Sequence, residues 1–157
     1  MEIDLALMAD AATVDGTGKL SVLGIFDQIA APQFPARHGR IALVLRFSTA
    51  AGDLGEHTVE IRLGGPGSTE VLRIEGKMGV PEGAQVPLAG RRNAQVLNLD
   101  GVVFPKPGAY SFEINLDGVH RLSVPLTVTQ LGGERVVEQS ARPPITFFPG
   151  SGGIPEA

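Results

Sequence analysis

Three histidines offer the side chain most often used in acid–base and metal chemistry. His38 lies in a proline-rich segment, His57 at the start of an expected strand, and His120 just after an Asp-Gly turn. No two of them have the i, i+2 or i, i+4 spacing that places two metal ligands on one face of a strand or helix. We therefore predict solvated loop histidines rather than a metal-binding or catalytic histidine.

Aspartates in turns are the second group with suitable chemistry. Asp53, Asp100 and Asp117 all lie in segments expected to turn, and loop carboxylates gathered at one end of a β-protein can bind Ca²⁺. Closely paired acids of the Asp-x-Asp type do not occur among them. The Asp-Gly pairs at 100–101 and 117–118 are explained by turns that require positive φ, so we predict turn residues there and no metal site.

Motifs for nucleophilic catalysis and phosphate binding are also lacking. The segment 64–69, GGPGST, is not followed by the Lys-Ser/Thr and helix of a phosphate loop, and we interpret it as a hairpin turn. Arg91, Arg92 and Asn93 could bind an anion, although such residues are more typical of a solvated strand entrance. No Gly-x-Ser-x-Gly motif surrounds the serines considered as nucleophiles, which are Ser21, Ser48, Ser68, Ser111, Ser123 and Ser140.

The composition removes further classes of chemistry. The chain has no cysteine, which excludes disulfides, thiolate metal sites, iron–sulfur clusters and thiol nucleophiles. Taken with the missing motifs, this leads us to predict no catalytic, cofactor-binding or metal-binding residues and no cofactor.

The charge pattern argues against nucleic acid and membrane partners. The formal net charge is −4, and the 13 basic residues are scattered along the chain, so no basic stripe can neutralise phosphates. No apolar run approaches the roughly 18 residues of a membrane span. The first four residues include two acids where a secretory signal carries basic residues. We expect a cytoplasmic protein.

Alternating apolar and polar residues predict strands through most of the chain. The clearest alternation, over residues 2–10, places Met8 on the polar face and four residues on the core face: Ile3, Leu5, Leu7 and Ala9. A turn at 15–18 follows, and the proline-containing loop 31–40 carries Phe34, which we expect to pack on a sheet edge. Further strands are expected over residues 19–26, 41–48, 57–63, 71–74 and 94–104.

The last part of this region gives the strongest local signal. Residues 107–128 form an expected hairpin with Tyr110 directed inward and a type I′ turn at Asp117 and Gly118. Before it, residues 77–92 contain two prolines, three glycines and isolated apolar residues, which favours a long connection between sheets. No segment has the apolar periodicity and capping signals of a helix.

The number and spacing of the strands predict the fold class. About eight short strands, each with one apolar face, favour two packed antiparallel sheets, since a parallel sheet needs helical crossovers. We predict an all-β, immunoglobulin-like or related β-sandwich over residues 1–130, with a small closed barrel as the alternative. Residues 131–157 are rich in glycine and proline and are expected to form a flexible tail or a docking arm.

Two parts of the sequence resemble a family of short bacterial proteins of unknown function. The opening segments DGTGKLSVLG (15–24) and APQFPA (31–36) resemble the first hairpin of that family and the stretch that follows it. The segment PGAYSFEINLDG (107–118) resembles the family's last hairpin and is also similar to the closing hairpin of immunoglobulin-like sandwiches. The resemblance covers about residues 1–129. It implies a cytoplasmic β-sandwich without a known activity, so it assigns no functional residue.

Three hypotheses about function remain. The first is a non-enzymatic binding or assembly module in which a protein partner, a second copy or residues 131–157 complete a sheet edge. The alternative is a small-ligand or carbohydrate-binding sandwich that uses the loops 31–40 and 77–93, with Phe34 and Phe104 as the remaining aromatic platforms. The third, a cupin-like or hydrolytic enzyme, has no motif in its favour.

Overall fold

The computed structural model describes residues 1–83, 85, 87 and 90–132. These residues form eleven strands and one short 3₁₀ turn, Pro66–Ser68, without an α-helix. The strands are β1 (Glu2–Val14), β2 (Leu20–Ile25), β3 (Gln28–Ala31), β4 (Ala36–Arg37), β5 (Arg40–Thr49), β6 (Gly55–Gly65), β7 (Thr69–Val80), β8 (Arg91–Asp100), β9 (Val103–Phe104), β10 (Gly108–Leu116) and β11 (Val119–Gln130). Within the described residues, no helix is long and apolar enough to cross a membrane.

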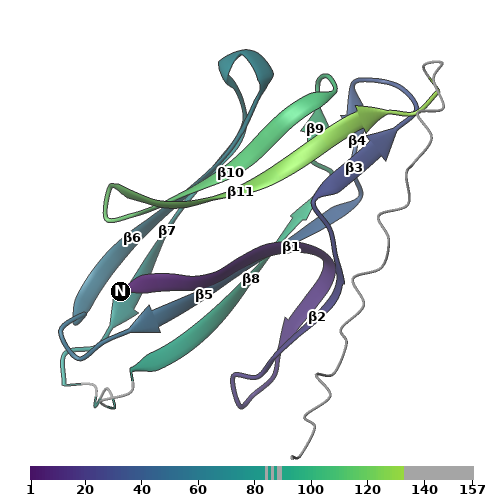
Figure 1. The fold of residues 1–157 in the computed structure, drawn as a ribbon. Coiled ribbons are helices and arrows are strands. Elements are labelled where there is room, and N and C mark those ends of the chain that lie inside the picture. Colours follow the sequence, from purple (N-terminus) through teal and green to yellow (C-terminus); the bar gives the residue numbers. More distant parts are fainter. Residues whose placement is uncertain (84, 86, 88–89, 133–157) are drawn as a thin grey trace, which may run out of the picture.

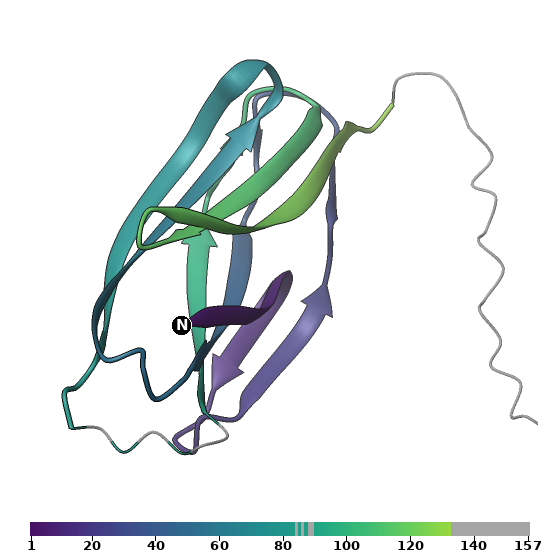
Figure 2. The same ribbon diagram turned by 60° about the vertical axis from the view of Figure 1, so that its left-hand side comes forward.

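The strands pair into three sheets (Figures 1 and 2). A four-stranded sheet has the order β2-β1-β5-β8, a five-stranded sheet has the order β3-β11-β10-β6-β7, and β4 pairs with β9. All pairs are antiparallel except β3 with β11, which is parallel. The parallel pair arises because the chain leaves the four-stranded sheet after β2 and enters the other sheet at β3 without a hairpin.

The inner faces of the two larger sheets share one apolar core. Every second residue of a strand points to this core, as the pleat of a strand requires. Tyr110 is 3% exposed and lies in the core, which confirms its predicted inward direction. Phe34, which was expected to pack on a sheet edge, is partly buried and packs against this core. The fully buried side chains come from both sheets and include Met8, Leu43, Leu45 and Phe47 on one side and Leu63, Phe112, Ile114 and Leu116 on the other.

The predicted all-β class is confirmed, while the prediction of about eight antiparallel strands in two sheets is corrected to eleven strands in three sheets. The additional strands are short: β3, β4 and β9 have four, two and two residues. They pair with residues far away in the sequence, such as Ala36 with Phe104. Local alternation cannot report pairing of this kind.

The predicted faces of β1 are wrong beyond its third residue. A β-bulge between Ile3 and Leu5 shifts the register against β5, and one added residue moves all later side chains to the opposite face. Met8 is therefore a core residue, 1% exposed, whereas Leu5 and Leu7 point away from the core and are half-buried. Residues 2–9 of β1 pair with β5 and residues 9–14 with β2, so this sheet curls along β1.

The segment 77–92 was also predicted incompletely. Its beginning belongs to β7, which pairs with β6 as far as Val80, and its end belongs to β8. The alternation fails because Gly76 and Gly79 stand within β7, although the backbone pairing continues through both. The type I′ turn is confirmed, since Asp117 and Gly118 both have positive φ and connect paired residues Leu116 and Val119.

The predictions for the C-terminal segment are not tested. β11 ends at Gln130, and residues 133–157, which make up nearly all of the predicted tail or docking arm, lie outside the described residues.

Candidate functional site

The first cluster of titratable groups lies where β6 begins and the β10–β11 turn packs against it. Asp117 Oδ2 is 2.7 Å from His57 Nδ1, and its Oδ1 accepts a hydrogen bond from the Thr58 amide at 2.9 Å. His57 Nε2 lies 3.2 Å from the backbone carbonyl oxygen of Asp53. The Asp53 carboxylate contacts the Met1 ammonium group.

The chemistry of this cluster is that of a structural link. Both acceptors of the His57 ring, a carboxylate and a carbonyl, favour the doubly protonated imidazolium. The hydrogen bond to Asp117 raises the pKa of His57, and the same bond lowers the pKa of Asp117. Because both ring nitrogens are already bonded within the protein, His57 has no free nitrogen for a metal ion or for proton transfer to a substrate.

The second cluster lies on the outward side of the β10–β11 hairpin. Ser123 Oγ donates a hydrogen bond to Glu113 Oε2 at 2.5 Å and lies 3.3 Å from His120 Nε2. The residue types match a catalytic triad, but the serine proton is directed to the carboxylate instead of the imidazole. The His120 and Glu113 side chains are 53% and 40% exposed, so water has free access. This arrangement does not activate a nucleophile.

The remaining sequence candidates are dispersed. His38 packs near the ring of Phe26, with ring centroids 5.7 Å apart. Asp100 forms a two-point ion pair with Arg40, 2.6 and 3.0 Å, and does not join Asp53 and Asp117. Arg92 bonds to Asp4 at 2.8 Å. Among the described residues, no three His, Asp or Glu side chains are close enough together to hold a metal ion.

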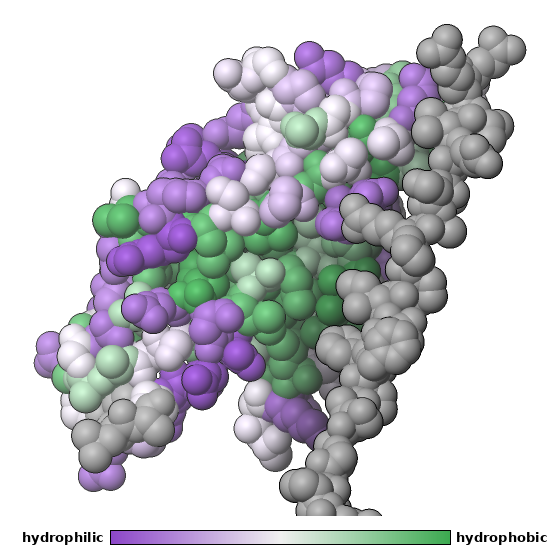
Figure 3. Space-filling model, viewed as in Figure 1, coloured by the Kyte–Doolittle hydropathy of each residue, from purple (hydrophilic) through white to green (hydrophobic). Residues whose placement is uncertain are grey.

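A different kind of surface occupies the outer face of the four-stranded sheet, which is the face turned away from the core. Two neighbouring cross-strand rows there are mainly apolar, and the second of them ends in the polar Asn98 of β8. We call these residues, with Leu23 of β2, the apolar outer face: Leu7, Val44 and Val96 in one row, and Ile25, Ala9 and Ala42 in the next. Leu23 and Ile25 are 72% and 66% exposed, whereas Ala9, Ala42 and Val44 are 0% exposed. The accessible part of this face is therefore formed by Leu23 and Ile25 with the half-buried Leu7 and Val96. Figure 3 shows a hydrophobic area that extends over β1 and β2.

Ion pairs flank the apolar outer face along the strands. At one end Asp4 accepts hydrogen bonds from Arg46 and Arg92, and the hydrogen bond from Arg46 lowers the pKa of Asp4. At the other end lies the pair of Arg40 and Asp100. Each charged group at these borders therefore has an opposite charge beside it.

The corresponding face of the five-stranded sheet is polar. One of its rows consists of Ser123, Glu113, Arg62 and Arg73, and the next contains Asn115, Glu60 and Glu75. Antiparallel sheets usually place polar residues on the face that meets water. The five-stranded sheet follows this rule, and the four-stranded sheet does not.

Comparison with known proteins places the chain in a family. Residues 4–129 match the model of a family of unknown function, DUF6941. The chain belongs to the DUF6941 family. The resemblance to a family of unknown function inferred from the sequence is thereby confirmed. No curated protein matches the chain.

The matched region, residues 4–129, begins within β1 and ends within β11, so it contains the whole apolar outer face. Sequence reasoning missed this face, because the bulge in β1 reverses Leu5 and Leu7. One available signal was the sequence of β5, in which residues 41–45 are all apolar. Ala42 and Val44 stand where a strand with one solvated face would carry polar residues.

Proposed function

We propose that this DUF6941 protein is a non-enzymatic assembly module that binds a second copy of itself through the edge of β2 and the apolar outer face. The observation that carries the proposal is β2 itself. It is an edge strand of sequence LSVLGI, without a charged residue or proline, and it exposes Leu23 and Ile25. Proteins normally protect such edges with charges, prolines or very short strands.

The other edge strands of the two larger sheets provide the comparison. β7 carries Glu70, Arg73, Glu75 and Lys77, β8 begins with Arg91 and Arg92, and β3 has only four residues. These edges carry the features that discourage strand pairing. β2 lacks them, which supports its role as the binding edge.

A second copy fits this surface for geometric and electrostatic reasons. Antiparallel pairing of β2 with β2 of another copy satisfies two-fold symmetry and joins both apolar outer faces into one. Burying a leucine or isoleucine that is otherwise exposed contributes about 1.5–3 kcal/mol. The charges of the three ion pairs beside the face, Arg40–Asp100, Arg46–Asp4 and Arg92–Asp4, are already compensated within each chain, so these groups add no strong repulsion when two copies meet.

The proposal also covers the type of fold, the limits of the domain and the place where the protein works. We propose that the two larger sheets form an immunoglobulin-like β-sandwich, that residues 1–130 are one domain, and that the protein works in the bacterial cytoplasm without nucleic acid or membrane partners. The shared core of the two sheets supports the sandwich. Residues 131–157 are a second candidate for the binding segment, and the experiment below separates them from β2.

The test is sedimentation velocity of the full chain over a range of concentrations. We expect a reversible dimer for the natural sequence and a monomer for the double variant Leu23→Asp/Ile25→Asp. The matched control is Val103→Asp/Val119→Asp, which changes two aliphatic residues that are 47% and 52% exposed elsewhere and should remain dimeric. A natural chain that stays monomeric would contradict the proposal. So would a dimer that survives the double change in β2 but is lost on deletion of residues 131–157.

A further inference from the structure

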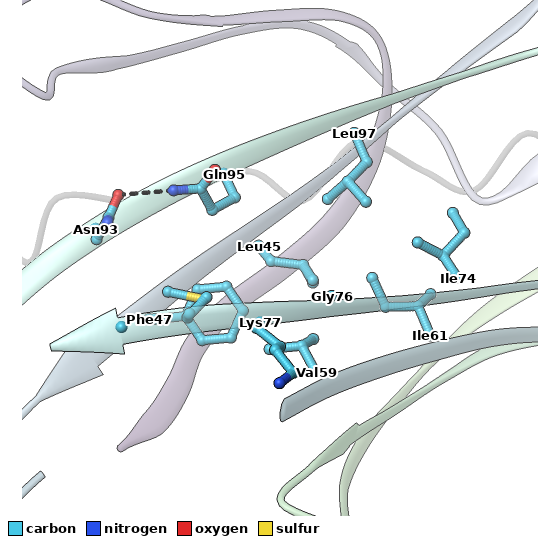
Figure 4. Close-up of a pocket in the computed structure, with 12 residues that line it drawn as sticks. Leu45, Phe47, Val59, Ile61, Ile74, Gly76, Lys77, Asn93, Gln95 and Leu97 are labelled. Atoms are coloured by element: carbon cyan, nitrogen blue, oxygen red, sulfur yellow. Dashed lines mark hydrogen bonds between the residues drawn. The ribbon is translucent and has the colours of Figure 1, made fainter. Parts of the chain in front are cut away.

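The gap between the edge strands β7 and β8 contains a cavity of about 390 Å³. These strands are the outermost members of the two larger sheets, and they lie on the side away from β2. The cavity extends to core side chains beneath them, among which Leu45, Phe47 and Ile61 are at most 2% exposed. Figure 4 shows these residues between the two edge strands.

Gly76 creates much of this space. It pairs with Val59 and stands in the row of core-facing residues of β7, between Ile74 and Met78. A Cβ atom added at Gly76 would meet no other atom within 4 Å. Glycine weakens the interior of a strand and often marks a place where a ligand approaches closely.

Two amides provide the polar part of the cavity. Asn93 and Gln95 stand on the core side of β8, in the same row as the apolar Leu97, but near its beginning, where both are exposed to solvent at the opening of the cavity. Gln95 Nε2 donates a hydrogen bond to Asn93 Oδ1 at 3.1 Å (Figure 4), which leaves the Gln95 carbonyl oxygen and the Asn93 NH₂ group for a ligand. An apolar pocket with a few convergent polar groups is the usual form of a small-molecule site.

The electrostatics of the cavity select an uncharged ligand. Among the described residues, Lys77 is the one charged residue that lines it, and its Nζ lies 2.7 Å from Glu56 Oε1 on the solvent side of β7. The hydrogen bond that Lys77 donates to Glu56 raises the pKa of Lys77, so its positive charge is already partnered within the chain. A charged ligand would find no opposite charge to compensate its desolvation.

We infer that this cavity binds a small, neutral, mainly apolar molecule that carries one hydrogen-bonding group. The apolar body lies against Phe47, Val59 and Ile61 in the space left by Gly76, and the polar group bonds to the amides of Asn93 and Gln95. The volume is at the lower end of the range for small-molecule sites, about 300–1,000 Å³. The inference does not depend on the proposed self-association, because β2 and the cavity lie at opposite edges of the sheets.

The probe for the test is N-phenyl-1-naphthylamine, a neutral aromatic amine with one N–H donor whose fluorescence increases in apolar surroundings. We expect saturable binding of one probe per chain. Gly76→Leu fills the cavity and should weaken binding by at least about tenfold, with a smaller loss for Gly76→Ala. Far-UV circular dichroism checks that each variant is folded, and Gly76→Ala serves as the test if the larger side chain prevents folding.

Two controls distinguish this site from the apolar outer face. Glu75→Leu adds an apolar side chain to the solvent face of the same strand, and Leu23→Asp/Ile25→Asp removes the exposed residues of β2. Both should keep the affinity of the natural chain for the probe. Absence of saturable binding, unchanged affinity in both Gly76 variants, or loss of binding in the β2 variant would each overturn the inference. Loss of probe binding in the β2 variant would not bear on the proposed dimer, which sedimentation tests separately.

Discussion

The side chain of His57 shows how one residue connects three segments of the chain. Its ring joins the β10–β11 turn at Asp117 to the loop that precedes β6 at Asp53. Asp117 is placed for this contact by its positive φ and by its amide, which donates to the Thr58 carbonyl oxygen at 2.8 Å. A residue expected to be a solvated loop histidine is thus a half-buried structural contact. The sequence could not reveal this, because its partner lies 60 positions away.

The raised pKa of His57 makes its contribution to stability depend on pH. Because the folded pKa exceeds the unfolded value of 6.5, the added stability is fully present below pH 6.5 and is lost as the pH rises through the folded pKa. We predict that His57→Gln lowers the free energy of unfolding more at pH 5.5 than at pH 9, as measured by urea denaturation.

The matched control for this pH dependence is His120→Gln, since His120 is exposed and lies outside the contact with Asp117. Its effect should be small at both pH values. An effect of His57→Gln that is equal at the two pH values, or larger at pH 9, would show that the ion pair with Asp117 does not stabilise the fold.

At the scale of elements, β1 decides which side chains of the four-stranded sheet meet the core. Its alternating sequence correctly predicts a strand, and Ile3 correctly faces the core. The bulge that follows depends on pairing with β5, a strand more than 30 positions later. Alternation within β1 carries no information about that partner, so the faces of Leu5, Leu7 and Met8 were assigned in reverse.

A pair of adjacent substitutions tests this bulge. Met8 fills the core at 1% exposure, whereas Leu7 lies half-buried on the apolar outer face. We predict that Met8→Ala lowers the free energy of unfolding by about 2–5 kcal/mol, and that Leu7→Ala lowers it by less than about 1.5 kcal/mol. Chemical denaturation of both variants at equal protein concentration provides the comparison. The reverse order would mean that β1 pairs without the bulge.

At the scale of the whole molecule, the two outer faces differ in chemistry. The five-stranded sheet presents Glu60 in ion pairs with Arg62 and Arg73, and the four-stranded sheet presents the apolar outer face. The sequence predicted the all-β class, the closing hairpin and the core-facing Tyr110, since each depends on local alternation or turn residues. It did not predict the apolar outer face or the cavity at Gly76, because both arise from the way distant strands come together.

The central claim, that β2 binds β2 of a second copy, is open to a direct measurement because the chain contains no cysteine. Single cysteines introduced in turn at positions 20–25 can form an intermolecular disulfide only where two Cα atoms come within about 7 Å of each other. We predict that disulfide-linked dimers form rapidly at one or two neighbouring positions of β2 and slowly for Val119→Cys at the β10–β11 turn. Equally slow formation at every position of β2, or faster formation at Val119→Cys, would contradict the account.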